Sequence, residues 1–511
     1  MVKLTLHLVL CVAVLSLAAC RPSPTATAPA GRGTPQSQPS PTPDGALFGI
    51  PWDDRTPFRT GLIADEQAVL SQLSGAAAYN IDLQIADDLL RLDGQQVVRY
   101  TNQETEPLGE VYFRLFPNLL GGVTHIQSVK ADGREVTPTY EFAESAMRVP
   151  LDAALPPGEA TLIEITFSVA VPTEGGGTYG MFGLSDGILA LAHSYPVIVV
   201  YDDEGWNLEI PPHHGDLLYA DNSFYLVRVT APAALTIVAS GVEIERKAGG
   251  QQQQVTYAGG PMRDFYLAAS TRYTVVSEHV AETTVNSYAP SEFVDGAKAA
   301  LDYAVNALRT YNGRFGVYPY TEFDLVSTPT LAFGIEYPGV VAIALRMYDS
   351  AENEYPPAYL ESTVAHEVCH QWFYSTVGND QLDEPWLDES LVQYATLLYW
   401  QDLYGSSGAA GFRESLRERW ARVDNAHIPI GMPARAYSDK EYGAIVYGRG
   451  PLFVETLANT MGQSEFDAFL RGYYDTFKWG IGTTEGLKNL AESHCDCDLT
   501  QLFADWVYEH E

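Results

Sequence analysis

Three residues in one short stretch have the types and spacing of a hydrolytic metal site. His366 and His370 are four residues apart, which places two imidazoles on one face of a helix. Glu367 lies beside the first of them, as in the motif H-E-x-x-H, where the carboxylate acts as a general base. A catalytic zinc takes three protein ligands and keeps a fourth position for water, so a third ligand must come from elsewhere.

Glu389 is the candidate for that third ligand. Eighteen residues separate it from His370, enough for one helix to end, turn and be followed by an antiparallel one. A second helical pattern begins near Pro385, so Glu389 falls in its first turns. Pro357 suits the start of the first helix and Gly378 its end, which predicts that the H-E-x-x-H motif lies in the middle of that helix.

The stretch HEVCHQWF, the eighteen-residue gap and the segment WLDES around Glu389 resemble the aminopeptidase N family of zinc peptidases. The resemblance implies one zinc ion per chain, with His366, His370 and Glu389 as ligands and Glu367 as the base. Ser390 stands where that family has a glycine. No other cofactor is expected.

Two further segments of the chain match motifs of this family and occur at the corresponding places along the chain. FGIEYPG resembles the exopeptidase loop G-A-M-E-N, with Gly334 and Glu336 as the matching residues, and a carboxylate near the metal can pair with the substrate's protonated amine. The preceding β-rich region shows no clear counterpart of the family's second amine-binding residue. Glu336 is therefore expected to bind the amine with little help.

Tyr447 is the candidate for stabilising the oxyanion. It lies in YGRG, which resembles the family's Y-x-K-G, with Arg449 in place of the lysine. A fixed phenol donor beside the metal stabilises the negative charge that develops on the carbonyl oxygen. Asp388, next to Glu389, is expected either to orient a ligand imidazole or to be a solvated carboxylate at a helix start.

The first 45 residues have the composition of an export signal and a tether. Residues 1–19 carry an early lysine and an apolar run, and LAAC at 17–20 resembles the lipobox of bacterial lipoproteins, which implies cleavage before Cys20 and lipid on its sulfur. Residues 20–45 are rich in proline, serine and threonine, as in a disordered tether. We expect an extracytoplasmic protein anchored to a bacterial membrane; the alternative is an ordinary signal with a chance cysteine.

The remainder predicts an α+β multidomain fold. Short alternating apolar segments indicate an all-β, sandwich-like domain over 46–287. Helical periodicity from Ser291 onward indicates a second domain over 288–511, and the family resemblance implies that it is a thermolysin-like α/β catalytic domain with a helical second lobe.

Composition excludes one class of partner. The chain has 65 acidic and 30 basic residues, a formal charge of −35, which repels nucleic acid backbones.

Cys495 and Cys497, with His494, lack the distant second pair that a metal site needs, so a second metal is a weak hypothesis. Oligomeric state and side-chain preference are left open by the sequence.

The function predicted from these features is a zinc aminopeptidase that removes N-terminal residues from peptides. A zinc endopeptidase or oligopeptidase is the alternative if Glu336 does not face the metal. A surface binding protein with a structural zinc is a third, although a structural zinc has no use for the general base Glu367.

Overall fold

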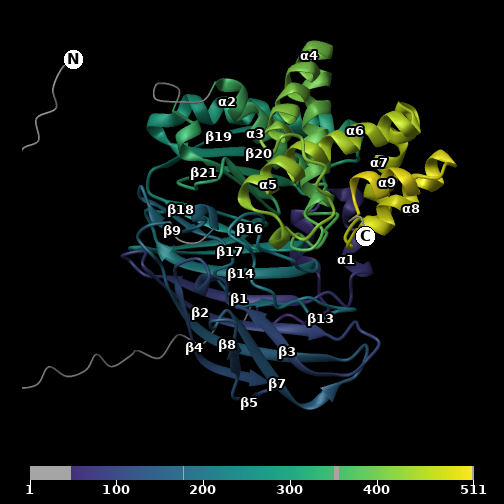
Figure 1. The fold of residues 1–511 in the computed structure, drawn as a ribbon. Helices are drawn as coiled ribbons and strands as arrows, with labels where there is room; N and C mark the ends of the chain where they lie inside the picture. The colour runs from purple at the N-terminus through teal and green to yellow at the C-terminus, as the bar shows by residue number, and fades with distance from the viewer. Residues whose placement is uncertain (1–47, 176–177, 350–355, 509–511) are drawn as a thin grey trace, which may run out of the picture. The chain divides into compact units, whose positions relative to one another are not determined.

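The computed structural model describes residues 48–175, 178–349 and 356–508 (Figure 1). The predicted signal segment 1–19 and tether 20–45 lie outside these residues. The sheets of the N-terminal half occupy the lower part of the view in Figure 1, and helices α2 to α7 lie above them. Among the described residues no helix has both the length and the apolar character needed to cross a membrane.

An eight-stranded sheet dominates the N-terminal half. Alternate residues of its strands are buried, as in β2, because one face packs on the core. In order across the sheet the strands are β16 (Val242–Gly249), β17 (Gln252–Met262), β14 (Ser223–Pro232), β1 (Ala78–Ile85), β2 (Arg91–Thr101), β8 (Ala160–Ala170), β4 (Val123–Ala131) and β5 (Arg134–Glu135).

Smaller sheets complete this half and share its hydrophobic core. One contains β11 (Val197–Ile198), β3 (Leu108–Arg114), β7 (Ala146–Leu155) and β6 (Thr139–Glu141). Another contains β15 (Thr236–Ala239), β18 (Leu267–Ser270), β10 (Ile188–Leu191) and β9 (Phe182–Ser185), and a hairpin pairs β12 (Tyr201–Asp202) with β13 (Gly205–Trp206). The predicted β-rich region is thus confirmed.

A five-stranded sheet begins the C-terminal half. Its order is β19 (Tyr273–Val280), β20 (Thr283–Pro290), β21 (Glu322–Thr328), β23 (Val340–Ala344) and β22 (Gly334–Tyr337), so β22 forms an edge. The domain boundary expected at residue 288 cuts through β20, which pairs in parallel with β21. In the sequence, the residue pattern changes from strand-like to helical only after β19 and β20, which already belong to this sheet.

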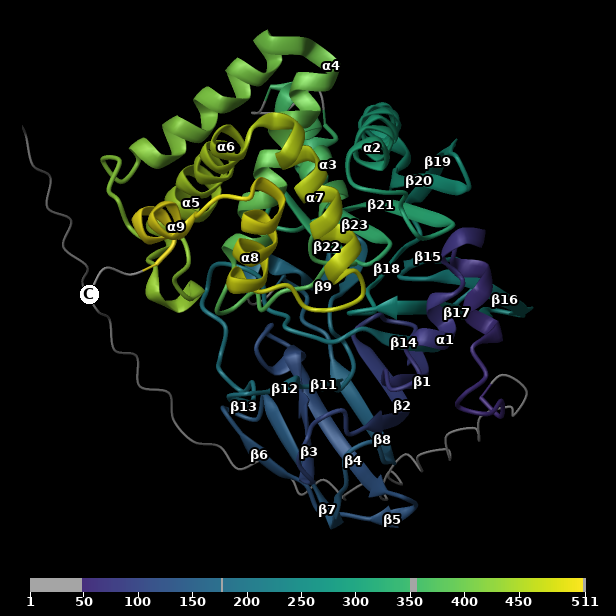
Figure 2. The same ribbon diagram turned by 90° about the vertical axis from the view of Figure 1, so that its right-hand side faces the viewer.

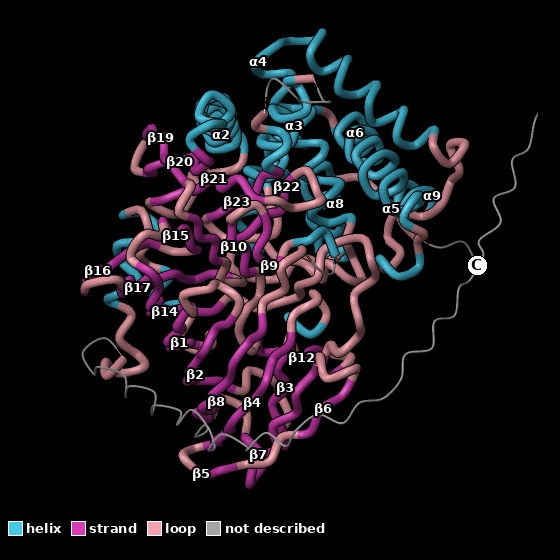
Figure 3. Tube along the Cα trace, turned by 90° about the vertical axis from the view of Figure 1, so that its left-hand side faces the viewer, coloured by secondary structure: helices cyan, strands magenta, loops and turns pink. Residues whose placement is uncertain are grey.

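Helices cover this sheet and continue into a helical lobe (Figure 2). Figure 3 shows in cyan that helices α2 to α6, α8 and α9 lie above the magenta strands β1 to β8 in that view. The α-helices are α1 (Val69–Gln72), α2 (Val294–Arg314), α3 (Pro357–Cys369), α4 (Trp386–Ala421), α5 (Asp439–Ala444), α6 (Gly450–Met461), α7 (Gln463–Phe477), α8 (Thr484–Cys495) and α9 (Thr500–Trp506), and a π-helix, η8, spans Ile445–Arg449. The short 3-10 helices are η1 (Thr56–Gly61), η2 (Ala64–Glu66), η3 (Phe116–Asn118), η4 (Thr178–Gly180), η5 (Ser291–Phe293), η6 (Leu345–Met347) and η7 (Ala434–Ala436).

The two helices that carry the metal motif differ in how well their bounds follow from sequence. α4 starts at Trp386 after Pro385, as expected, and Gly405, at φ 67°, interrupts it in a conformation that glycine permits. The prediction that α3 runs to Gly378 is wrong, because α3 ends at Cys369 and His370 is its C-cap. In the segment that follows, the Gln371 side chain accepts a hydrogen bond from Gly339 N and donates one to the carbonyl oxygen of Tyr337, in the β22–β23 hairpin.

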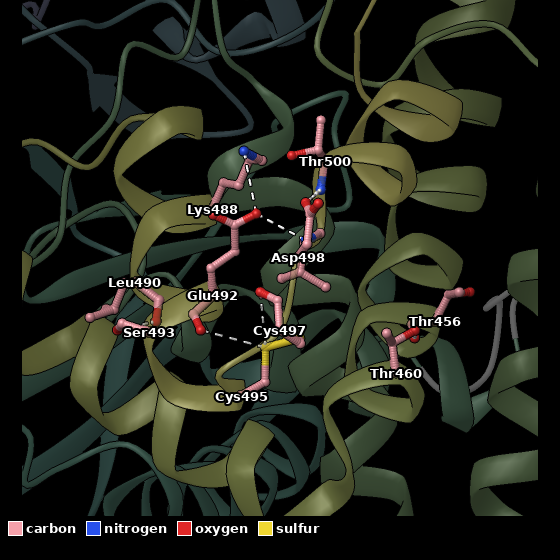
Figure 4. Close-up of a disulfide and its surroundings, with 11 residues drawn as sticks. Thr456, Thr460, Lys488, Leu490, Glu492, Ser493, Cys495, Cys497, Asp498 and Thr500 are labelled. Carbon is pink, nitrogen blue, oxygen red and sulfur yellow. Dashed lines mark hydrogen bonds and ion pairs between the residues drawn. A yellow bond between two sulfur atoms is a disulfide. The ribbon is translucent and has the colours of Figure 1, made fainter.

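Cys495 and Cys497 form a disulfide at the end of α8 (Figure 4). Beside it, Glu492 accepts a hydrogen bond from the backbone N–H of Leu499 at 2.9 Å. With their sulfurs joined, the two cysteines offer no thiolates, so the hypothesis of a second metal there has no support.

A buried arginine connects the two halves. Arg263 follows β17, is 2% exposed, and donates from Nε to the carbonyl oxygen of Tyr374 and from Nη1 to that of Ala220, each at 2.8 Å. Its Nη2 donates to the carbonyl of Gly480. A single guanidinium thus fixes the segment after the metal helix α3 against the N-terminal half.

We predict that Arg263→Met lowers the free energy of unfolding by at least about 3 kcal/mol, because several buried carbonyls lose their donors. Chemical denaturation followed by fluorescence measures the change. The control is Arg246→Met, because Arg246 forms a solvent-accessible pair with Glu243 and its loss should cost less than about 1 kcal/mol. Equal effects of the two substitutions would contradict the role given to Arg263.

Candidate active site

The predicted ligand atoms converge on one point. His366 Nε2 lies 3.1 Å from His370 Nε2 and 3.1 Å from Glu389 Oε2, and His370 Nε2 lies 3.7 Å from the same oxygen. All three residues are buried, with Glu389 only 3% exposed. The structure therefore brings together the three residues that sequence spacing selected.

These separations fit zinc. Ligand atoms about 2.0–2.1 Å from a tetrahedral zinc lie roughly 3.3 Å from one another, close to the distances above. Within the described residues Glu389 Oε2 accepts no hydrogen bond although it is buried. Two ring nitrogens and one carboxylate oxygen that point at the same position can bind a divalent cation of borderline softness, such as Zn²⁺.

The protonation states also suit metal binding. Burial lowers the pKa of His370 to about 4, which keeps its imidazole neutral, and its Nδ1 lies 3.1 Å from the carbonyl oxygen of Phe373. Burial opposes the charge of Glu389, but the contact with His366 and the hydroxyl of Tyr447 hold its pKa below the usual range. Neutral imidazoles and an ionised carboxylate are the forms that coordinate metal.

Glu367 lies where the edge strand passes over the site. A Cβ on Gly334, the first residue of β22, would lie 2.4 Å from Glu367 Oε1, so only glycine leaves room for this carboxyl group. Burial raises the pKa of Glu367, and the charges of Glu389 and Asp216 add to the effect. A carboxyl group with a raised pKa can accept a proton from water and release it again.

Tyr447 projects from the π-helix η8 and donates a hydrogen bond to Glu389 Oε1. Its neighbour Val446 accepts a hydrogen bond from Ser390 Oγ at 2.7 Å, so the residue that replaces the family's glycine ties η8 to α4. Arg449, which replaces the family's lysine, is buried and donates to the carbonyls of Ile428, Trp506 and Asp505. Its contacts are structural.

Glu336 lies in the same site. Gln381 Nε2 donates to Glu336 Oε1 at 3.2 Å and to Asp388 Oδ2 at 2.8 Å, and oxygens of both carboxyl groups lie within 4.8 Å of a His370 ring nitrogen. Asp388 is 1% exposed, so the prediction of a solvated carboxylate is wrong. Through Gln381, Asp388 positions Glu336 rather than an imidazole.

Sequence reasoning missed Asp216. This residue lies between β13 and β14, and it interacts electrostatically most strongly with Glu336 and then with Glu389. Burial and these like charges raise its pKa. Asp216 lies in the segment HHGD at 213–216, which matches no motif, so the sequence carries no signal that selects it.

Comparisons with known proteins agree with this geometry. Residues 299–506 match the model of the peptidase family M1 domain. Aminopeptidase M1 of Arabidopsis thaliana is 23% identical over 298 residues, which are 55% of this chain and 34% of that protein. Aminopeptidase 2 of Candida albicans is 21% identical over 463 residues, 87% of this chain and 48% of that protein. The chain thus spans a third to a half of the length of these relatives.

A solved structure shows the same fold over most of the chain. The M1 zinc metallopeptidase from Deinococcus radiodurans superposes with a TM-score of 0.62 at 18% identity, covering 85% of this chain and 94% of that one. With the domain match, this confirms the α+β architecture of a β-rich half followed by a catalytic half. Residues 299–506 thus match a peptidase family M1 domain, and the fold of the chain is similar to that of a solved M1 zinc metallopeptidase.

We predict that His370→Ala reduces bound zinc from about one ion per chain to a small fraction, because a site with two remaining ligands binds metal far more weakly. Atomic absorption on protein dialysed against trace zinc provides the measurement. His427→Ala serves as the control, since His427 lies against Trp420 and outside the ligand cluster. Undiminished zinc in the His370 variant would reject the ligand assignment.

Proposed function

We propose that the protein is a zinc aminopeptidase that removes single residues from the free amino terminus of peptides. The observation that carries this proposal is the position of Glu336, whose carboxyl oxygen lies within 4.8 Å of a ring nitrogen of the ligand His370. A buried carboxylate at this distance pairs with a protonated amine and fixes the first residue of the substrate beside the metal. An endopeptidase has no such use for it.

The side chains then have distinct roles. A zinc ion held by His366, His370 and Glu389 would supply a polarised water of lowered pKa. Glu367 takes the proton of this water and delivers it to the leaving amine, and Gly334 leaves the space in which that carboxyl group lies. Tyr447, held beside Glu389, offers a hydroxyl to the developing oxyanion.

The names of the similar proteins support the proposed aminopeptidase function. Relatives from plants, yeast and archaea are named aminopeptidases. A variant of the Deinococcus radiodurans M1 zinc metallopeptidase is described as bound to a Tyr-Ser-Ala substrate. A peptide with a free amino terminus is thus the substrate class that we propose for this chain.

We predict that Glu367→Gln keeps zinc and fold but lowers turnover of aminoacyl chromogenic amides by roughly 10²–10⁴-fold, because an amide cannot accept the proton. Rates are measured with and without chelator, beside zinc content. Glu361→Gln is the matched control on the same helix: Glu361 is buried but accepts from Tyr399 and Tyr404, away from the ligands. Full activity of the Glu367 variant would reject the proposed chemistry.

We also propose that the protein is held at the outer side of a bacterial membrane by lipid on Cys20. The support is the LAAC sequence at 17–20 followed by a segment rich in proline, serine and threonine, which suits a tether. No nucleic acid partner is expected from the charge of −35.

For this anchor we expect Cys20→Ser to move the protein from the membrane fraction to the soluble fraction while its peptidase activity is unchanged. Fractionation with immunoblotting and mass spectrometry of the mature N-terminus measure both. Wild-type protein that is already soluble and begins at another residue would refute the anchor.

A further inference from the structure

Helix α3 and the edge strand β22 pack against each other, and the candidate site lies along their contact. An oxygen of Glu336 lies within 4.8 Å of a ring nitrogen of His370. Two residues earlier in β22, a Cβ on Gly334 would lie 2.4 Å from Oε1 of Glu367, which is three residues earlier in α3. Moving back along both elements therefore leads from Glu336 past the proposed base.

Two aromatic side chains come next in the same direction. Phe333, directly before β22, and Tyr359, in the first turn of α3, have ring centroids 6.2 Å apart. Tyr359 comes seven residues before His366, and two helical turns of about 3.6 residues place both side chains on the same face of α3. The aromatic pair therefore lies on the side of Glu367 that is opposite to Glu336.

The side chains at this end are exposed, although the site beside them is buried. Phe333 is 39% exposed, Tyr359 is 48% exposed, and Leu331, two residues before Phe333, is 70% exposed. Single exposed apolar side chains are ordinary in folded proteins, but a group of them beside a functional site marks a surface that contacts a ligand or partner. We call Leu331, Phe333 and Tyr359 the apolar rim.

Hydrogen bonds hold the strand side of the apolar rim in place. The guanidinium of Arg346 donates to the three carbonyl oxygens of residues 330–332, at 2.6 to 2.9 Å. Its central carbon lies 5.5 Å from the ring centroid of Phe333. The carbonyl oxygen of Phe333 accepts a hydrogen bond from Ala344 N, at the end of β23, at 2.8 Å. The exposed side chains therefore project from a fixed backbone, as a surface that selects substrates requires.

We infer that the apolar rim binds the side chain of the second substrate residue, the one after the cleaved bond, and favours large apolar residues there. This inference rests on the proposed function, in which the substrate's amine binds Glu336 and the cleaved bond lies beside Glu367. The second residue of such a peptide lies beyond Glu367, on the side of the apolar rim. An aliphatic or aromatic side chain in that place removes apolar surface of both molecules from water.

Peptides that differ only in their second residue test this inference. The zinc-loaded wild type, Phe333→Ala and Tyr359→Ala are each given the tripeptides Ala-Leu-Ala, Ala-Phe-Ala and Ala-Gly-Ala. Chromatography measures kcat/KM for release of the first alanine. The ratio of kcat/KM for the leucine or phenylalanine peptide to that for the glycine peptide is the preference of the enzyme.

We expect a preference of about tenfold or more in the wild type, since a side chain in an apolar subsite is worth at least that much. Phe333→Ala and Tyr359→Ala should each lower it by about threefold or more, and Phe333→Leu, which keeps an apolar side chain, should preserve most of it. Tyr140→Ala is the control, because Tyr140 in β6 is similarly exposed, at 42%, and lies in the N-terminal half. A wild-type preference near one, or one that neither alanine substitution lowers, overturns the inference.

Peptide binding gives a readout that does not depend on turnover. In the zinc-loaded Glu367→Gln variant, calorimetry should show Ala-Leu-Ala binding about tenfold more tightly than Ala-Gly-Ala, and adding Phe333→Ala should remove most of this difference. Equal affinities overturn the inference. Wild-type protein that releases no alanine from any of the three peptides, with normal zinc, would instead refute the proposed function, while the affinities still decide whether the apolar rim binds a peptide side chain.

Discussion

Concentrated negative charge in a buried site is the constraint on which this structure depends. Five carboxyl groups surround two imidazoles, those of Asp216, Glu336, Glu367, Asp388 and Glu389. Two like charges roughly 4 Å apart repel by about 4 kcal/mol at an effective dielectric constant near 20. Such a cluster is compatible with folding when protons and bound cations balance part of the charge. Burial first, and then the neighbouring carboxylates, raises the pKa values of Glu336 and Asp388, so a cation bound in the site stabilises their charged forms.

Backbone hydrogen bonds from buried polar side chains hold the cluster in place. Arg263 fixes the segment after α3, and Gln371 ties the same segment to the β22–β23 hairpin, so His370 at the helix end is as well fixed as a residue inside a helix. Ser390 performs the same task between α4 and the π-helix. A π-helix has about one residue more per turn than an α-helix. The hydrogen bond from Ser390 Oγ holds this irregular segment, from which Tyr447 reaches Glu389.

The sequence predicted those parts of the site that lie in local motifs. His366, Glu367 and His370 share a few residues of chain, and Glu389, Glu336 and Tyr447 each lie in a short pattern with a fixed order along the chain. Asp216 could not be predicted because it interacts with Glu336, more than a hundred residues away in the chain. Gln381 could not be predicted because its side chain comes from an irregular turn. The end of α3 was misplaced, and the residue after its C-cap, Gln371, forms its hydrogen bonds with Tyr337 and Gly339, which no local pattern reveals.

The boundary between the halves illustrates the same limit and bears on function. Strand periodicity assigned residues 273–287 to the N-terminal domain, yet β19 pairs with β20 and β20 with β21, within the sheet that ends in β22. The N-terminal half therefore continues directly into the sheet of the C-terminal half, and the loop that carries Asp216 starts from strands packed into the common core. The two halves thus contribute to one site: Asp216 comes from the N-terminal half, whereas the residues expected to carry out the chemistry all lie in the second half.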